Sequence, residues 1–159
     1  MPDPILARAA DAGLVVLGWR EWLCLPQLDI GPLRAKLDTG ARSSSLHVDT
    51  LEEFHRDGAH WLRFSLRLGR RQAHDMQCEA RSTDRRTVTD TGGRRTERWF
   101  IRTQVELAGV AFDMDVNLTD RRHMLFPLLL GRSALSGRFV IDPSRSHTLP
   151  RPPVPAQNA

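Results

Sequence analysis

The sequence predicts a mainly β protein on the basis of three observations. Residues 60–69 alternate polar and apolar side chains, and residues 97–109 and 110–118 do the same. Such alternation is typical of strands that bury one face. Ala108-Gly109, at the junction of the last two segments, is typical of a tight hairpin turn, so these segments are expected to pair. Segments with helical periodicity are scarce.

The N-terminal part is expected to contribute further strands. Residues 1–13 form a predicted N-terminal extension that is partly disordered. Residues 14–30, LVVLGWREWLCLPQLDI, mix apolar and β-favouring side chains, and Pro26 is expected to interrupt the strand structure. Residues 49–58, DTLEEFHRDG, favour a helix instead, because an Asp or Thr would cap its start and the glycine would end it.

The C-terminal part combines an apolar strand with irregular segments. Residues 126–135, FPLLLGRSAL, predict a strand that runs into a short helix at residues 131–137. Residues 82–96 are polar, Gly-containing and Arg-rich, which favours a mobile hairpin or an exposed loop. The chain shows no internal repeat. We therefore place one domain at residues 14–146, followed by a Pro-rich tail, residues 147–159, that is expected to be disordered.

The composition is that of an ordinary water-soluble globular protein. Of the 159 residues, 40% are hydrophobic and 26% are charged, and no apolar run approaches the roughly 18 residues of a membrane span. The N-terminus lacks the basic start, apolar centre and cleavage site of a secretory signal, which predicts a cytoplasmic protein. Cys24 and Cys78 stand alone in the sequence and are expected to be reduced and partly buried.

The charge of the chain favours an acidic partner. The net charge is +4, and Lys36 is the only lysine among the 23 basic residues. Arginine binds carboxylate and phosphate groups through paired N–H groups, so an acidic peptide or a nucleic acid would suit this chain. An arginine-rich solvated surface without any partner is equally consistent with the count. The absence of tyrosine and the low aromatic content, 6%, count against nucleic acid, since single strands are bound by base stacking.

Common catalytic and metal-binding motifs are absent from the sequence. There is no H-E-x-x-H, no G-x-S-x-G and no phosphate-binding P-loop. Residues 113–117, DMDVN, resemble the start of a calcium loop, but the glycine and the glutamate that such a loop requires further on are missing. On a strand, Asp113, Asp115 and Asn117 would share one face, which we expect to be the solvated one.

The sequence around Asp38 carries the most specific signal. Residues 35–41, AKLDTGA, bring this carboxylate from the end of a strand into a turn, where Gly40 permits a tight backbone. Much later an apolar strand ends in Leu129, Leu130, Gly131 and Arg132. The two segments resemble the retropepsin-like aspartic peptidases. In that family an Asp-Thr-Gly-Ala turn is supported by a strand that ends in two apolar residues and a glycine, followed by arginine and a helix.

Further blocks narrow the resemblance to one bacterial group. GWREWLCLPQLDI, NLTDRRHMLFPLLLGRSAL and FVIDPSRS are similar to a group that carries the name ATP-dependent zinc protease and is retropepsin-like despite that name. The resemblance implies a closed β-barrel or sandwich with one short C-terminal helix, a β-hairpin flap and no cofactor. Members are associated with ATP-grasp enzymes that ligate glutamates to protein C-termini. It therefore also implies a peptide or protein substrate with an acidic, glutamylated tail.

The resemblance also implies roles for the site residues. Asp38 would be one half of a pair of carboxylates that hold the attacking water, Thr39 would brace the turn, and Gly40 would offer its N–H to the pair. Because the chain has one D-T-G and no repeat, the second aspartate would come from the other subunit of a homodimer. The substrate would be contacted by Ala41, Arg42, Gly92 and Gly93, the two glycines lying in a flap over residues 82–96. Structural support would come from Leu129, Leu130, Gly131 and Arg132.

Arg42 departs from the pattern of retroviral members, which commonly carry at this position an acidic residue that pairs with the late arginine. Arg132 is therefore expected either to bind another carboxylate or to face an acidic substrate together with Arg42. The candidate carboxylates are Asp120, Asp142 and Glu21. The serines of residues 43–45 are expected to hydrogen-bond the backbone of the turn. Residues 124–126, Met-Leu-Phe, are expected in the core or at a dimer contact.

Three classes of function stay open at this point. The first is an aspartic peptidase that uses Asp38, and it is the function we expect. The second is a zinc-dependent metallohydrolase in which Asp38 and one or more histidines bind the ion. His47 and His123 are the candidate histidines, although we expect no metal. The third is a non-catalytic module that binds acidic protein tails through its arginines.

Overall fold

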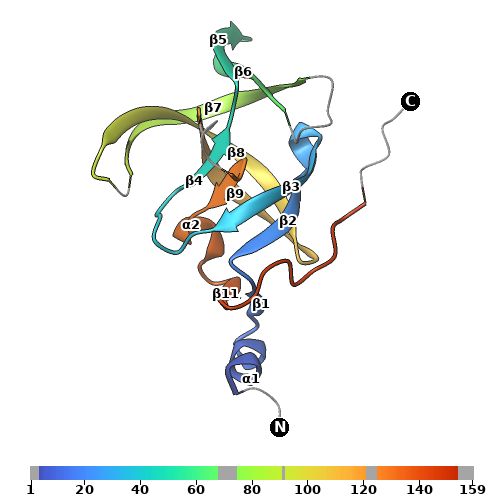
Figure 1. Ribbon diagram of the computed structural model, residues 1–159. Helices are drawn as coiled ribbons and strands as arrows, with labels where there is room; N and C mark the ends of the chain where they lie inside the picture. The colour runs from blue at the N-terminus through green and yellow to red at the C-terminus, as the bar shows by residue number, and fades with distance from the viewer. Residues whose placement is uncertain (1–3, 68–74, 91, 121–124, 154–159) are drawn as a thin grey trace.

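The alternating segments of the sequence form the strands of a closed six-stranded β-barrel (Figure 1). The computed structural model of the protein describes residues 4–67, 75–90, 92–120 and 125–153. The barrel strands follow one another in the order β2, β3, β10, β4, β9 and β8, and β8 pairs back with β2. Their bounds are Arg20–Leu25 for β2, Ile30–Leu37 for β3, Ser44–His47 for β4, Arg95–Leu107 for β8, Val110–Thr119 for β9 and Leu128–Leu130 for β10.

The interior of the barrel is filled by the inward-facing apolar side chains of these strands. The fully buried ones include Leu23, Leu25, Ile30, Ala35, Leu46, Ile101, Val105, Val116, Leu128 and Leu130. Removing these side chains from water is the main source of stability for a barrel of this size. The mainly β class and the closed barrel predicted from the sequence are confirmed.

The hairpin predicted at Ala108-Gly109 is present. β8 and β9 pair antiparallel up to Leu107 opposite Val110, and the two residues between them have φ of 56° and 72°. Positive φ at both central residues is the requirement of the hairpin turn whose twist matches that of paired strands.

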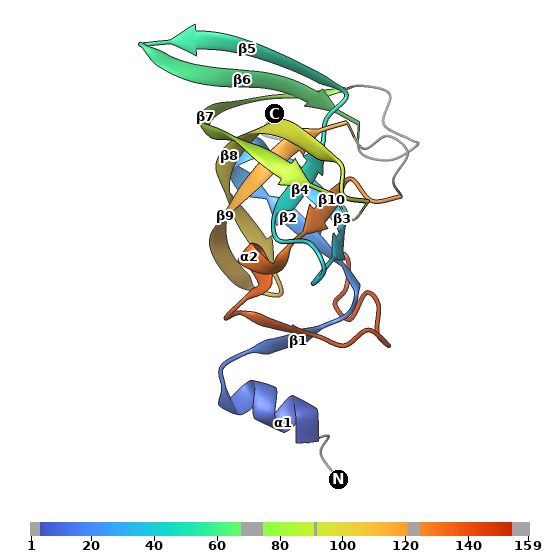
Figure 2. The ribbon, with the colours of Figure 1, turned by 90° about the vertical axis from the view of Figure 1, so that its left-hand side faces the viewer.

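Three further strands extend the sheet beyond the barrel. They are β5 (Thr50–Arg56), β6 (Ala59–Leu66) and β7 (Met76–Thr89). The first half of β7 pairs with β6, and its second half pairs with the barrel strand β8. β7 therefore connects the barrel to β6 and β5, which lie outside it (Figure 2). The second half of β7 and the first half of β8 form a two-stranded ribbon, so the flap predicted over residues 82–96 is a β-hairpin.

The helix predicted over residues 49–58 is wrong, because this segment forms β5. Asp57-Gly58 is a hairpin turn instead of a helix stop, with φ of 52° and 77°. The turn brings β5 antiparallel to β6, and the side chain of Phe54 packs on that of Trp61 with ring centroids 6.3 Å apart. Cross-strand pairing therefore overrides the local signals for a helix.

The two ends of the described chain lie outside the barrel sheet. Helix α1 (Pro4–Asp11) lies at the opposite end of the molecule from β5 and β6 (Figures 1 and 2). Strands β1 (Val15–Leu17) and β11 (Phe139–Ile141) form a small parallel pair. The remaining elements are the short helix η1 (Pro26–Leu28) and helix α2 (Arg132–Leu135), the short helix predicted after the apolar strand. None of the helices in the described chain is long and apolar enough to span a membrane.

The chain after β11 lies against β2. The carboxylate of Glu21 is completely buried, and its Oε1 accepts hydrogen bonds at 2.6 Å from both the backbone N–H and the hydroxyl of Thr148. Leu149 packs against the core. The composition of this Pro-rich segment gives no sign of such a contact, which depends on the buried carboxylate of a distant strand. Both cysteines are free, Cys78 buried and Cys24 partly buried, as predicted.

Candidate active site

Asp38 is positioned by two strands that are far apart in the sequence. It follows β3, and β10 runs parallel to β3 with Leu130 opposite Leu37. The backbone N–H of Asp38 donates to the carbonyl of Leu130 at 2.8 Å. The N–H of Gly40 donates to Oδ1 of Asp38 at 2.9 Å, which fixes the orientation of the carboxylate. This is the contact between Gly40 and the aspartate that the resemblance implies.

The residues after β10 hold the Asp38 loop, residues 38–43, from behind. The N–H groups of Arg132 and Ser133 donate to the carbonyls of Ala41 and Arg42, at 2.8 and 3.1 Å. Gly131 makes this close approach possible: a Cβ atom there would lie 2.5 Å from the carbonyl oxygen of Ser43. Since φ of Gly131 is −90°, which any residue can adopt, the glycine is required for space alone.

Arg132 has a backbone partner in place of the expected carboxylate. Its Nη1 donates to the carbonyl of Thr39 at 3.0 Å, so the guanidinium ties helix α2 to the turn that carries Asp38. Of the carboxylates considered, Glu21 binds Thr148, and Asp142 binds Ser144 and Arg145.

The serines of the loop hydrogen-bond the backbone in part, as predicted. The hydroxyl of Ser44 accepts from the N–H of Gly131 at 3.0 Å. Ser45 differs, since its hydroxyl accepts at 3.4 Å from the side chain of Arg98.

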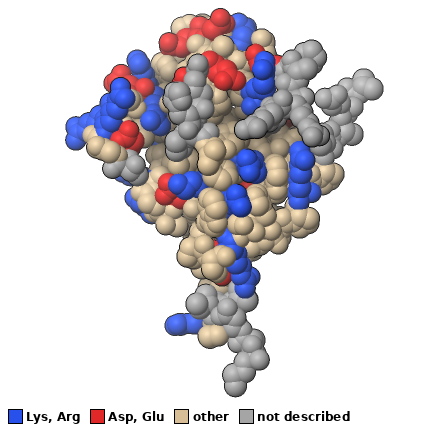
Figure 3. Space-filling model, in the orientation of Figure 1, with Lys and Arg blue, Asp and Glu red and all other residues tan. Residues whose placement is uncertain are grey.

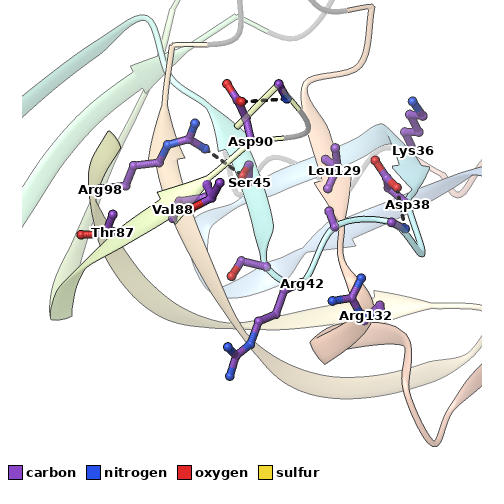
Figure 4. A pocket seen from close by; sticks show the side chains of 15 residues that line it. Lys36, Asp38, Arg42, Ser45, Thr87, Val88, Asp90, Arg98, Leu129 and Arg132 are labelled. Carbon is purple, nitrogen blue, oxygen red and sulfur yellow. Dashed lines mark hydrogen bonds between the residues drawn. The ribbon is translucent and has the colours of Figure 1, made fainter. Parts of the chain in front are cut away.

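Asp38 lines a groove of about 700 Å³ between this loop and the ribbon of β7 and β8 (Figure 4). The other lining residues are Lys36, Gly40, Ala41, Arg42, Ser43, Ser45, Thr87, Val88, Thr89, Asp90, Gly92, Arg98, Leu129 and Arg132. The ribbon contributes its turn, where Oδ1 of Asp90 accepts the N–H groups of Gly92 and Arg94, each at 2.9 Å. Of the two flap glycines, Gly92 thus lines the groove, and Gly93 lies beside it in the same turn with φ of 82°.

The groove has an excess of positive charge. Its cations are Lys36, Arg42, Arg98 and Arg132, against the carboxylates Asp38 and Asp90. Within the described chain none of these cations forms an ion pair, whereas elsewhere on the ribbon Arg85 pairs with Glu97 and Arg86 with Asp84. Blue and red side chains are accordingly interspersed where the ribbon projects (Figure 3). The unpaired cations favour an anionic ligand in the groove.

The sequence analysis did not identify Arg98, which lines the groove, or its partner Asn117 as residues of the site. Nη1 of Arg98 donates to Oδ1 of Asn117 at 3.2 Å. Asn117 is completely buried, and its Nδ2 donates to the carbonyl of Ser44 at 2.8 Å. The prediction that this face is solvated is therefore wrong for Asn117, although Asp113 on the same face is exposed. One feature of the sequence indicates that Asn117 is buried: the residue after Asp113 and Asp115 on this face is an asparagine. An amide can donate to a buried carbonyl, and a carboxylate cannot.

Of the two candidate metal ligands, His47 lies beside two carboxylates. Its Nε2 is 2.8 Å from Oδ1 of Asp49, and its Nδ1 is 3.9 Å from Oδ1 of Asp120. Within the described ranges no three His, Cys, Asp or Glu side chains are grouped so that they would hold a metal ion. His123 lies outside the described residues.

The sequence matches over residues 16–152 a family described as RimB-like, the retropepsin-like aspartic endopeptidase RimB. The chain belongs to the RimB-like family. A solved structure of a Legionella pneumophila protein of unknown function is similar to the RimB-like chain with a TM-score of 0.71 and 30% identity, covering 84% of this chain and 97% of that one. The strand that returns behind Asp38 is thus part of a family fold.

Proteins named probable alpha-L-glutamate ligase are also similar to the RimB-like chain. The protein from Shewanella pealeana is 33% identical over 135 residues, and that from Desulfotalea psychrophila is 34% identical over 137 residues. Both alignments cover 84% of this chain but only 30% and 29% of the relatives. The chain therefore spans about 30% of the length of these curated relatives.

Proposed function

We propose that this RimB-like protein is an aspartic-type endopeptidase in which Asp38 is one half of the catalytic pair. The observation that carries the proposal is the position of Asp38. Its carboxylate is oriented by the N–H of Gly40, its backbone is held from behind by β10, and it lines a groove of about 700 Å³. A peptide bond in that groove would be covered by the hairpin of residues 82–96, which would exclude bulk water.

The second carboxylate is supplied by a second copy of the chain. Within the described residues of the groove the other carboxylate is Asp90, and it already accepts two backbone N–H groups of its own turn. A two-fold homodimer would instead place Asp38 against Asp38 of its partner, because such an interface brings identical residues together.

The paired carboxylates would hydrolyse the peptide bond through one shared proton. Two carboxylates in contact cannot both ionise, so one is protonated and one is not. The ionised one takes a proton from the bound water as the water oxygen bonds to the carbonyl carbon, while the protonated one donates to the carbonyl oxygen. The C–N bond of the intermediate then breaks as the carboxyl that took the proton of the water gives it to the nitrogen. The other carboxylate takes a proton from a hydroxyl of the intermediate, so the pair again holds one proton.

The substrate that we propose is a protein tail rich in glutamate. Four cations of the groove form no ion pair within the described chain, so they would attract and orient carboxylate side chains. The curated relatives, which contain a segment similar to this chain, are named probable alpha-L-glutamate ligases. A peptidase that removes glutamates would undo the modification that such a ligase makes.

The test is hydrolysis of a peptide that ends in several glutamates, followed by mass spectrometry. Asp38→Asn is expected to reduce the rate to background. Asp90→Asn is the matched control, because it removes a carboxylate from the same groove while its amide oxygen still accepts the two N–H groups of the turn. Equal rates for Asp38→Asn and wild type would contradict the proposal. Loss of wild-type activity on chelation, restored by zinc, would contradict it as well and indicate a metallohydrolase.

A further inference from the structure

We propose that Arg98 is a specificity-determining residue that binds a carboxylate of the substrate in the Asp38 groove. This inference rests on the proposed function and names the residue that selects glutamate over neutral side chains. It comes from the surroundings of Arg98, which differ from those of the other arginines in the ribbon.

Arg98 is a partly buried cation whose hydrogen-bond partners are neutral. Its Nε donates to the hydroxyl of Thr96 at 3.0 Å, and its Nη1 donates to Asn117 and Ser45 at 3.2 and 3.4 Å. Burial lowers the pKa of the Arg98 guanidinium, an effect that the more distant charge of Asp90 opposes. Partial burial of a charge is offset when a counterion is in contact with it, and within the described chain Arg98 has none.

The guanidinium keeps donors free for a ligand. Arginine carries five N–H donors, and the bonds of Arg98 to the described chain use Nε and Nη1, so Nη2 is left without a partner there. The three neutral acceptors hold the side chain in one orientation over the groove, as Figure 4 shows for its contact with Ser45. A carboxylate is the ligand that suits this guanidinium, since it can accept from Nη2 and supplies the missing negative charge.

Arg98 is also connected to the loop that carries Asp38. Asn117, which accepts from Arg98, donates to the carbonyl of Ser44, and the Ser44 hydroxyl accepts from the N–H of Gly131. A carboxylate bound by Arg98 would therefore be held at a fixed distance from the reacting peptide bond. This is how a remote contact raises the rate for one substrate and not for another.

The other arginines of the groove, Arg132 and Arg42, are less suited to this task. Arg132 is engaged with the carbonyl of Thr39. Arg42 is exposed, and its side chain points away from Asp38 in Figure 4. Exposed charges are hydrated and screened by salt, so they attract acidic peptides without distinguishing one position of the chain from another.

The experiment compares two peptides and three variants. One peptide ends in several glutamates, and the other has glutamine at the same positions. Arg98→Met removes the charge and the donors, Arg98→Lys keeps the charge without the fork of N–H groups, and Arg102→Met is the matched control. Arg102 lies on the same strand but is exposed and paired with Asp113 and Asp115.

The expected result is a selective loss. Arg98→Met should raise KM for the glutamate peptide about 10- to 100-fold and leave the glutamine peptide within about twofold, because only the charged hydrogen bonds are removed. Arg98→Lys should give a smaller rise for the glutamate peptide, and Arg102→Met should change neither. An equal loss on both peptides would show that Arg98 only braces Asn117, and no loss would show that it does not bind substrate. Either result overturns the proposal.

Two measurements separate a loss of substrate recognition from a loss of folding and from a loss of catalysis. Thermal unfolding shows whether Arg98→Met is folded, and if it is not, Arg98→Lys compared with Arg102→Lys decides the question in the same way. Fluorescence anisotropy with labelled peptides measures binding to the Asp38→Asn protein, which needs no catalysis. If the proposed peptidase activity failed while Arg98→Met still lost binding of the glutamate peptide alone, the specificity role would stand and the reaction would be wrong. Binding that does not distinguish the two peptides would overturn the role of Arg98.

Discussion

Replacing Gly131 with alanine tests whether β10 positions Asp38. The added Cβ would lie 2.5 Å from the carbonyl oxygen of Ser43, whereas an ordinary contact begins at 3.4 Å, so the two segments would have to separate by about 0.9 Å. Overpacking of this kind costs about 2–3 kcal/mol of unfolding free energy. A displacement near 1 Å in a catalytic group lowers the rate by roughly 100-fold. We therefore expect a moderate loss of stability and a large loss of activity.

Gly18→Ala is the matched control for this prediction. A Cβ atom at Gly18 would meet the backbone of Arg145 at least as closely, but Arg145 does not line the groove. Urea unfolding followed by tryptophan fluorescence should give similar losses for the two variants. At low urea and a temperature where both are folded, only Gly131→Ala should lose kcat/KM on the glutamate peptide. Wild-type activity in Gly131→Ala, or an equal loss in Gly18→Ala, would refute the positioning role.

The remaining predictions concern the interior and the C-terminal segment. Asn117→Ala should lower the free energy of unfolding by about 1–3 kcal/mol in urea, because it removes the buried hydrogen bond from the Asn117 amide to the carbonyl of Ser44; an unchanged midpoint would contradict this. Burial, aided by Arg20, lowers the pKa of His147 from its ordinary 6.5, so the docked segment is stable above that pH and loses stability as the pH falls through it. The fluorescence of Trp22, whose ring lies 5.7 Å from that of His147, should report this release in wild type and not in His147→Gln. Burial, with a smaller effect of Asp29, raises the pKa of Cys78 to about 11, so at pH 8 iodoacetamide should modify Cys78 at least about tenfold more slowly than in urea; equal rates would contradict the burial.

The fold could be predicted from the sequence where local patterns and long-range pairing agree. Residues 60–66 alternate polar and apolar side chains, as their strand pairing requires. Ala108-Gly109 is typical of the hairpin turn that it forms. Residues 49–58 could not be predicted, because a D-G pair ends a helix or makes a hairpin turn, and only the partner strand decides which.

The candidate site could be predicted only in part. Asp38 and Gly131 belong to short motifs whose residue types are dictated by a tight turn and a close approach. Arg98 and Asn117 meet through the register of β8 and β9 and are surrounded by other strands, so nothing local distinguishes them from surface residues. The backbone partner of Arg132 likewise depends on where helix α2 lies, which the sequence pattern alone does not give.

Mixing subunits tests the central claim, that two copies of Asp38 form one catalytic pair. Wild type and Asp38→Asn are combined at a fixed total concentration, exchanged under mild denaturation, and assayed on the glutamate peptide. If both copies are needed, activity falls with the square of the wild-type fraction, so that an equal mixture keeps about one quarter. Activity proportional to the wild-type fraction, with about one half left in that mixture, would show that each chain works alone and would contradict the account.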